Sequence, residues 1–374
     1  MTTEQSPKEE PTPTPPHFEE HLSESAHSAT IGGETFDYTA TAGRFLLTEE
    51  EGEKKASFFF VSYTRDEVAD PSERPIVFAF NGGPGSASVW LHLGLLGPRR
   101  VYLDDEGNQT PPPGRLVAND ESILDVADLV FIDPVSTGFT RAIPGKEASS
   151  FYHFTRDIEM VGRFIRLYLN RFGRWASPKY LIGESYGTTR SAGLARHLLE
   201  RYGMYLNGVI LISSVLNFQT IAVDKTTKTF HRGNDLPYLL YLPSYAAAAW
   251  YHHKLEDDLQ ALPLTDVLAE AEAFASGDYM VALWQGDRLL EEDRSRTAAE
   301  IARLTGLSPE FVERSDLRIE KFHFLKELLR SDGYTMGRID SRYKGIDRYL
   351  VGSMLENDPS IDATLGSYAA MFND

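Results

Sequence analysis

Short apolar runs alternate with helical patterns between residues 76 and 212. Four of these runs are continuously apolar, which is typical of strands buried on both faces of a parallel sheet. They lie at residues 76–80, 129–132, 180–182 and 208–212. Helical patterns separate them at residues 151–172 and 188–202, and Gly203 follows the second helix as a stop signal. This alternation predicts an α/β fold with a mostly parallel sheet flanked by helices.

The pattern differs before and after this region. Residues 1–29 are polar, acidic and proline-rich, which predicts a disordered leader. Residues 43–48 and 56–63 are strand-like and are joined by an acidic turn, so we expect an antiparallel hairpin. We place the first part of the sheet core at residues 30–219.

After about residue 217 the parallel-strand signals vanish, and residues 220–374 are helical in character. Thr297 and Glu300 form a capping-box pattern, and Ser308-Pro309 is typical of a helix start. We therefore expect residues 220–374 to form a helical cap inserted into the sheet domain.

Composition narrows the classes of partner. The 374 residues carry a formal net charge of −18, which argues against binding to nucleic acid or anionic membranes. The chain has no cysteine, so disulfides and thiolate metal sites are excluded and a nucleophile must be an oxygen or an amine. The first residues lack a basic start followed by an apolar stretch, which makes a cytoplasmic location the expectation.

The segment Gly183-Glu184-Ser185-Tyr186-Gly187 stands between a strand-like run and a helical one. It has the form of a nucleophile elbow, in which a tight turn exposes a serine and the flanking glycines let strand and helix approach closely. A serine hydroxyl attacks well only when it is held beside a base and an oxyanion pocket. We interpret Ser185 as a catalytic nucleophile.

A second glycine-rich segment, Asn81-Gly82-Gly83-Pro84-Gly85-Ser86, directly follows the strand at residues 76–80. Backbone N–H groups in such a loop can bind an anion. A phosphate loop is one interpretation, but neither nucleotide-binding glycine motif fits this spacing. A simple tight turn is another. With an elbow serine in the same sheet, a second donor of an oxyanion hole is the interpretation that we favour.

Together these segments resemble the serine carboxypeptidase family of α/β hydrolases. The matching pieces are Phe80–Ser88, Leu96-Gly97-Pro98, Ile123–Phe139 and Tyr180–Gly187, in the order of the family and within residues 35–219. The resemblance implies an α/β-hydrolase fold with a helical cap, a peptide substrate with a free C-terminus, and no cofactor or metal. It also implies that Ser185 is the nucleophile and that the amides of Gly83 and Tyr186 form the oxyanion hole. By the same resemblance, Asn81, the Gly82 amide and Glu184 bind the terminal carboxylate of the substrate.

Two departures from the family pattern matter. The family usually places an acidic residue two positions before its Gly-Pro, facing the glutamate beside the serine, and this chain has Leu95 there. We expect a weaker preference for acidic pH or altered exopeptidase selectivity, unless Leu95 only packs and another residue supplies the contact.

The second departure concerns the catalytic Asp and His, which in this family lie after the cap on the last strands of the sheet. This chain ends at Asp374, still in cap-like sequence or just beyond it. The histidines after Ser185 lack the expected strand-and-loop setting; they are His197, His231, His252, His253 and His323. We therefore expect a fragment or truncated homologue without the last sheet strands, or a base supplied from elsewhere.

Three other interpretations remain open or are set aside. A serine esterase or acyltransferase would use Ser185 without carboxylate recognition, and a non-catalytic remnant would keep only a binding surface. The residues His17, Glu20 and His21 match a metalloprotease pattern, but that site requires a rigid helix and a further ligand. We read this match as chance, because it lies in the proline-rich leader.

Overall fold

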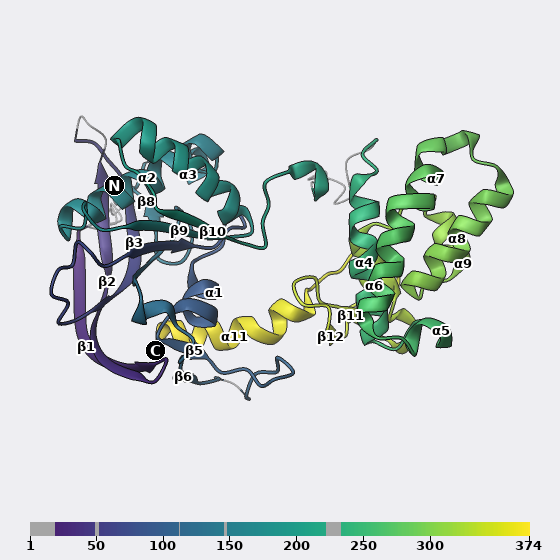
Figure 1. Ribbon diagram of the computed structural model, residues 1–374, viewed down its shortest axis with the longest axis horizontal. Helices are drawn as coiled ribbons and strands as arrows, with labels where there is room; N and C mark the ends of the chain where they lie inside the picture. Colours follow the sequence, from purple (N-terminus) through teal and green to yellow (C-terminus); the bar gives the residue numbers. More distant parts are fainter. Residues whose placement is uncertain (1–18, 49–51, 112, 146–147, 222–232) are drawn as a thin grey trace, which may run out of the picture. The chain divides into compact units, whose positions relative to one another are not determined.

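The computed structural model describes residues 19–48, 52–111, 113–145, 148–221 and 233–374. The chain divides into two compact units (Figure 1). The α/β unit comprises Met1–Tyr102, Arg115–Leu216 and Met371–Asp374, and the helical unit comprises Leu103–Gly114 and Asn217–Ala370. The main division therefore falls close to the predicted boundary at residues 219 and 220. Two short segments differ from the predicted division: Leu103–Gly114 belongs to the helical unit, and Met371–Asp374 belongs to the α/β unit.

The α/β unit is built on one mixed sheet with the strand order β1-β2-β3-β7-β4-β9-β10. Its first three strands are antiparallel, and the other four run parallel to one another. The bounds are β1 (His21–Ile31), β2 (Glu34–Thr48), β3 (Lys54–Arg65), β4 (Ile76–Phe80), β7 (Asp128–Ile132), β9 (Lys179–Glu184) and β10 (Gly208–Ile212), with the two-residue β8 (Arg141–Ala142) paired to β3. The predicted hairpin and the four predicted parallel strands are confirmed. The order and direction of these strands agree with an α/β-hydrolase sheet.

Two helices pack on this sheet (Figure 1): α2 (Phe154–Arg171) and α3 (Tyr186–Tyr202). The strongly amphipathic α2 buries Phe164 against Phe58 and Phe60, with ring centroids 5.8 and 5.5 Å apart. The helix α3 ends at Gly203, which has a left-handed φ of 62° and so supplies the predicted stop. This packing fixes the start of α3 beside the carboxyl ends of the parallel strands.

The predicted disordered leader extends too far. Residues 21–29 belong to β1, which pairs antiparallel with β2 from His21 to Ile31. Most of β1 is exposed, so the strand is held by its ladder of backbone hydrogen bonds and needs few apolar side chains. Its polar composition therefore resembles that of a linker.

The strand β10 lies where predicted, but its burial was predicted wrongly. Val209, Ile210 and Leu211 keep 39%, 46% and 38% of their surfaces exposed. Within the described part of the chain β10 pairs with β9 alone and forms the edge of the sheet. A strand of the buried parallel type thus stands uncovered beside β9.

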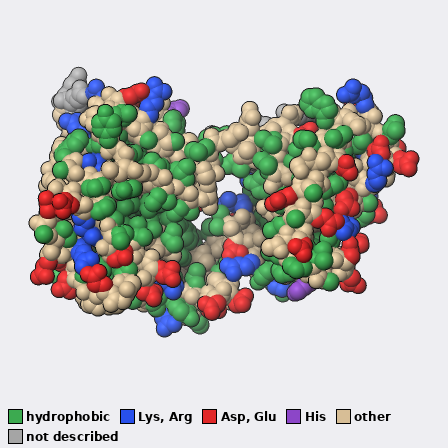
Figure 2. Space-filling model, in the orientation of Figure 1, with side chains coloured by type: hydrophobic (Ala, Val, Ile, Leu, Met, Phe, Trp, Pro, Cys, Tyr) green, Lys and Arg blue, Asp and Glu red, His purple; other side chains and the backbone are tan. Residues whose placement is uncertain are grey.

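The helical unit has its own core around Leu242, Tyr245, Ile301 and Phe324. Its helices are α4 (Leu236–Tyr251), α5 (Asp257–Gln260), α6 (Leu264–Phe274), α7 (Met280–Gln285), α8 (Glu291–Thr305), α9 (Pro309–Arg314), α10 (Lys321–Glu327) and α11 (Pro359–Asn373), the last of which ends in the α/β unit. Two-residue strands β11 (Thr335–Met336) and β12 (Lys344–Gly345) form a small hairpin. Acidic side chains gather beside α8 and α9 (Figure 2).

One of the two predicted helix starts in this unit is confirmed. The Ser308 hydroxyl accepts a hydrogen bond from the Phe311 amide at 3.2 Å and caps α9. The capping box at Thr297 is wrong, because α8 already begins at Glu291 and the Thr297 hydroxyl donates to the Asp293 carbonyl inside the helix. Among the described helices, none combines the length and the apolar character that crossing a bilayer requires.

Candidate active site

Ser185 occupies the turn between β9 and α3 and has a φ of 56° and a ψ of −125°. Such a backbone conformation costs a non-glycine residue about 1–3 kcal/mol and persists only where neighbours enforce it. Here the Ser185 amide donates to the Ile212 carbonyl on β10, and its carbonyl accepts from the Thr188 amide, both at 2.9 Å. The Thr188 hydroxyl donates to the same carbonyl at 2.7 Å. The half-buried Ser185 side chain therefore stands at a tight, braced elbow.

The elbow glycines are required by close backbone approaches. A Cβ atom on Gly183 would come 2.1 Å from the Gly187 carbonyl oxygen, and one on Gly187 would come 2.8 Å from the Phe80 carbonyl oxygen. Real Cβ atoms do not tolerate such distances to backbone. The two glycines thus let β9, α3 and the end of β4 meet around Ser185, as the sequence pattern predicts.

The glycine loop after β4 lies against the first residues of α3. A Cβ atom on Gly82 would come 2.4 Å from the Tyr186 nitrogen and 2.6 Å from the Gly187 nitrogen. The next residue, Gly83, has a φ of +104°, which favours glycine. Amides in the first turn of a helix have no partner within the helix. Gly83 and Tyr186, the two predicted oxyanion donors, therefore belong to segments in contact.

Asn81 connects this loop to the residue before the serine. Its side-chain Nδ2 donates to Glu184 Oε2 at 3.0 Å, and its Oδ1 accepts from the Leu91 amide at 3.0 Å. The second contact sets the orientation of the amide, because only its oxygen can accept. One N–H of Nδ2 remains after the bond to Glu184. The structure thus places Asn81, Gly82 and Glu184, the predicted carboxylate-binding residues, next to one another.

A buried carboxyl group braces the same loop from a neighbouring strand. Asp133 follows β7, and its Oδ1 accepts from the Ser88 amide and from the Ser88 hydroxyl, both at 2.9 Å. Burial raises the pKa of Asp133. Ser88 precedes the short helix α1 (Val89–Leu91), which carries the amide that orients Asn81. Sequence reasoning assigned Asp133 no role, although it lies in the segment Ile123–Phe139 that carries the resemblance.

The described residues bring no histidine into hydrogen-bonding contact with Ser185. His197 lies 12 residues further along α3, about 18 Å at the rise of an α-helix, and packs against Gly162 on α2. His252 and His253 contact Ser341 and Gln260 within the helical unit. His323 belongs to α10 of that unit, and His231 lies outside the described residues. Among the described residues, no contact places any of these four histidines as a base for Ser185.

Leu95 lies in the π-helical segment η1 (His92–Leu96) and is 48% exposed. Its carbonyl accepts from Asn119, which fixes the backbone there. The hydrogen bond that the described residues provide to Glu184 comes from the amide of Asn81. The expectation that Leu95 weakens acid preference stays a prediction.

The metalloprotease-like pattern remains unsupported. His17 lies outside the described residues, and His21 belongs to the strand β1. Glu20 accepts from the Leu46 amide at 3.1 Å and from Arg171 at 2.8 Å, so its carboxylate is engaged in holding β2 and α2. The described residues contain no cluster of acidic and histidine side chains that could hold a metal ion.

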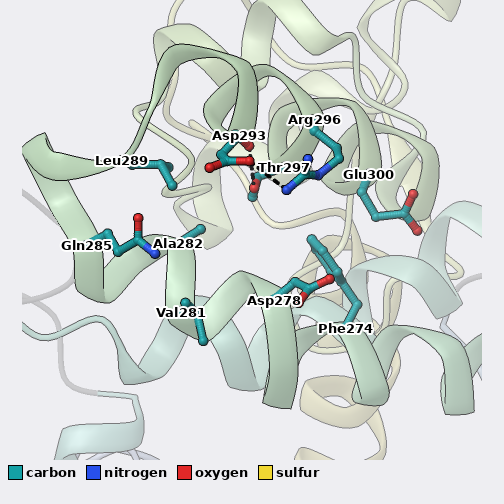
Figure 3. A pocket seen from close by; sticks show the side chains of 10 residues that line it. All are labelled: Phe274, Asp278, Val281, Ala282, Gln285, Leu289, Asp293, Arg296, Thr297 and Glu300. Carbon is teal, nitrogen blue, oxygen red and sulfur yellow. Dashed lines mark hydrogen bonds and ion pairs between the residues drawn. The ribbon is translucent and has the colours of Figure 1, made fainter.

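A separate hollow of about 340 Å³ lies in the helical unit between α6, α7 and α8 (Figure 3). Arg296 on its wall is paired with Asp293 at 2.6 Å. Its lining mixes apolar and acidic side chains, namely Phe274, Asp278, Val281, Ala282, Gln285, Leu289, Asp293, Arg296, Thr297 and Glu300. The hollow lacks an activated nucleophile, and we do not assign it chemistry.

Residues 35–238 match the sequence profile of the serine carboxypeptidases, which is more than half of the chain. The chain belongs to the serine carboxypeptidase family. The match contains every predicted site residue of the α/β unit, from Asn81 to Tyr186. Membership in this family also agrees with the α/β-hydrolase arrangement of the sheet.

Individual family members align with part of the chain. The pheromone-processing carboxypeptidase KEX1 of Saccharomyces cerevisiae is 31% identical over 156 residues, which is 39% of this chain and 20% of that protein. Serine carboxypeptidase-like 36 of Arabidopsis thaliana is 28% identical over 172 residues, 44% of this chain and 33% of that protein. The crystal structure of KEX1 from S. cerevisiae, at 20% identity, covers 64% of this chain and 47% of its own with a TM-score of 0.40. The matches thus span less than two thirds of these relatives.

Proposed function

We propose that this chain carries the nucleophile, the oxyanion donors and the carboxylate-binding residues of a serine-type carboxypeptidase. The observation that carries the proposal is the Ser185 elbow, with a φ of 56°, beside a Gly82 on which a Cβ atom would come 2.4 Å from the Tyr186 nitrogen. Family membership supports a carboxypeptidase-like activity at this site. The substrate would be a peptide with a free C-terminus.

The proposed reaction begins when the Ser185 oxygen attacks the carbonyl carbon of the last peptide bond. The negative charge that develops on the carbonyl oxygen would be stabilised by the amides of Gly83 and Tyr186. Collapse of this intermediate expels the C-terminal amino acid and leaves an acyl group on Ser185. Water then hydrolyses the acyl-enzyme in the second half of the reaction.

Recognition of the terminal carboxylate would restrict cleavage to the last residue. In this proposal the second N–H of Asn81 Nδ2 and the Gly82 amide would donate to that carboxylate, while the first N–H of Nδ2 is bonded to Glu184. Glu184 would contribute by holding the Asn81 side-chain amide in place beside the substrate carboxylate. In this proposal Asn81 serves both groups, because its amide orients Glu184 and retains a donor for the substrate.

The proton of Ser185 requires an acceptor that no described histidine provides. His231 is the histidine after Ser185 whose position is not described, and a separate polypeptide segment is the other source. A triad enzyme without its base keeps only the residual rate from the oxyanion hole and from binding. The same observation favours a second candidate function, a non-catalytic relative that binds peptide C-termini without cleaving them.

The deciding experiment compares matched peptides and a Ser185→Ala control. Purified chain is incubated with a peptide bearing a free C-terminus and with the same peptide amidated, and released amino acid is measured. A carboxypeptidase releases the last residue from the free peptide only, and Ser185→Ala abolishes the release. Equal cleavage of amidated peptides or simple esters would instead indicate an esterase or acyltransferase. Binding of the free peptide without release would indicate the non-catalytic relative.

A further inference from the structure

A buried arginine on α3 ties together the two backbone segments of the proposed oxyanion hole. Arg190 is 1% exposed, and its Nε donates to Asp157 Oδ2 on α2 at 2.9 Å. Its Nη1 donates to the Asn81 carbonyl at 2.8 Å. The guanidinium carbon lies 5.3 Å from the ring centroid of Phe80 and 5.2 Å from that of Tyr186.

Two contacts of Arg190, to the Asn81 carbonyl and to the Tyr186 ring, fall on the segments that carry the proposed oxyanion donors. The Asn81 carbonyl belongs to the peptide group immediately before the one that contains the Gly83 amide. Fixing that carbonyl therefore limits rotation of the loop that presents Gly83. On the other segment, the Tyr186 ring lies over the Arg190 guanidinium. Burial and the Asp157 carboxylate raise the pKa of Tyr186 to about 12, so the phenol stays protonated at neutral pH.

We propose that Arg190, held by Asp157, is a positioning residue that sets the spacing between the Gly83 and Tyr186 amides. The proposal deepens the proposed function and rests on it for its catalytic meaning. Planar guanidinium geometry is essential here, because one group must serve a carboxylate, a carbonyl and two aromatic faces at once. A lysine would keep the charge but would lose this arrangement.

The alternative is that Arg190 and Asp157 form a buried ion pair with a purely structural role. The same unit provides a matched control at the opposite end of the sheet. Arg174 is 5% exposed and pairs with Asp128, the first residue of β7. Because active-site loops follow the carboxyl ends of parallel strands, this second pair lies away from the elbow. It also holds buried charge without touching either donor segment.

The test compares Arg190→Lys with Arg174→Lys by two measurements on the folded, full-length chain. The first is amide hydrogen exchange in peptides that cover residues 80–88 and 183–190. The second is the second-order rate at which a fluorophosphonate probe labels Ser185, normalised to the folded fraction. We expect Arg190→Lys to accelerate exchange in both peptides and to slow labelling about tenfold to hundredfold, since small displacements of catalytic groups have effects of this size. Arg174→Lys should lower stability while leaving both local measurements as in the wild type.

The outcomes separate the positioning role from the proposed function. If Arg190→Lys matches Arg174→Lys in both measurements, the positioning role is overturned and the hydrolase assignment stands. If the wild-type chain is not labelled but exchange in both peptides increases, positioning is supported and the proposed function fails. Should Arg190→Lys not fold, Asp157→Asn removes the carboxylate that holds the Arg190 guanidinium. It should slow labelling about threefold to tenfold and accelerate exchange at residues 183–190; wild-type values would overturn the proposal.

Discussion

Gly82 lies so close to Tyr186 that a Cβ atom placed on it would come 2.4 Å from the Tyr186 nitrogen. This contact joins the loop after β4 to the start of α3, and it brings the predicted oxyanion donors onto neighbouring segments. The backbone of Gly82 has no positive φ that would itself demand glycine. Its requirement for glycine is therefore a matter of space alone.

Gly82→Ala should destabilise the α/β unit by about 3 kcal/mol, because a methyl group would overlap backbone that cannot move aside. Gly85→Ala is the matched control: its Cβ would meet open space, but its φ of +112° should cost about 1–2 kcal/mol. Urea unfolding of both variants gives the comparison. A loss for Gly82→Ala no greater than that for Gly85→Ala would refute the close contact with α3.

The position of Leu95 offers a test of carboxylate recognition. With Leu95→Glu, the new carboxyl group and that of Glu184 could share a proton. This pair could bind a peptide C-terminus for as long as it keeps the shared proton. We expect affinity for a free-C-terminus peptide about tenfold higher below the pKa of the pair than above it. Leu95 is 48% exposed, so the substitution should be tolerated in the fold. The measurement is the dissociation constant across pH, with Leu95→Gln as the non-titrating control; identical profiles for the two variants would exclude this account.

His92 should make the α/β unit sensitive to acid. Burial lowers the pKa of His92 to about 3, and its Nε2 shares a 2.6 Å hydrogen bond with the Tyr63 hydroxyl. In the unfolded chain the His92 imidazole binds a proton near pH 6.5. The contribution of neutral, buried His92 to the free energy of unfolding is therefore complete above pH 6.5 and is lost as the pH falls towards 3. At pH 5 the loss should be about 2 kcal/mol.

His92→Gln should remove this pH dependence while keeping a partner for Tyr63. Unfolding is followed by tryptophan fluorescence in a Trp250→Phe, Trp284→Phe background, which leaves the two tryptophans of the α/β unit as reporters. His27→Gln, on the exposed strand β1, serves as the control. If the stability of His92→Gln falls between pH 7 and pH 5 as steeply as that of His27→Gln, the buried neutral state of His92 is wrong.

The edge strand β10 should promote self-association. Val209, Ile210 and Leu211 expose apolar surface on a strand whose outer edge has no neighbouring strand among the described residues, a combination that favours pairing with another chain. We expect Ile210→Lys to lower the association seen by analytical ultracentrifugation over a range of concentrations. Val126→Lys adds the same charge at a 61% exposed site outside the sheet. Equal effects of the two lysines would show that net charge, and not the strand edge, governs association.

Much of the α/β unit could be predicted because its signals are local. The strands β4, β7, β9 and β10 can be recognised because they are apolar over consecutive residues. The turn at Ser185 can be recognised because its five residues, Gly183 to Gly187, form a contiguous motif. The predicted site residues Asn81, Gly82, Glu184 and Ser185 lie on adjacent segments for the same reason. The glycine loop and the elbow both follow the carboxyl ends of neighbouring parallel strands, β4 and β9.

The remaining features depend on neighbours that are distant in sequence. Arg190 and Asp157 are 33 residues apart, and Arg190 and Asn81 are 109 apart, so no local pattern marks their contact. β1 could not be recognised because an exposed edge strand needs little apolar character. The exposure of β10 was missed because its sequence has the apolar character of a covered strand, whereas the described chain covers it on one side only.

The most direct test of the account is the structure of a covalent adduct between Ser185 and a peptidyl phosphonate. In that adduct one phosphonate oxygen occupies the place of the oxyanion. We predict a bond from phosphorus to Ser185 Oγ and that oxygen about 2.7–3.1 Å from both the Gly83 and the Tyr186 nitrogens. An adduct whose oxygen contacts neither amide, or a chain that forms no adduct at Ser185, would contradict the central claim.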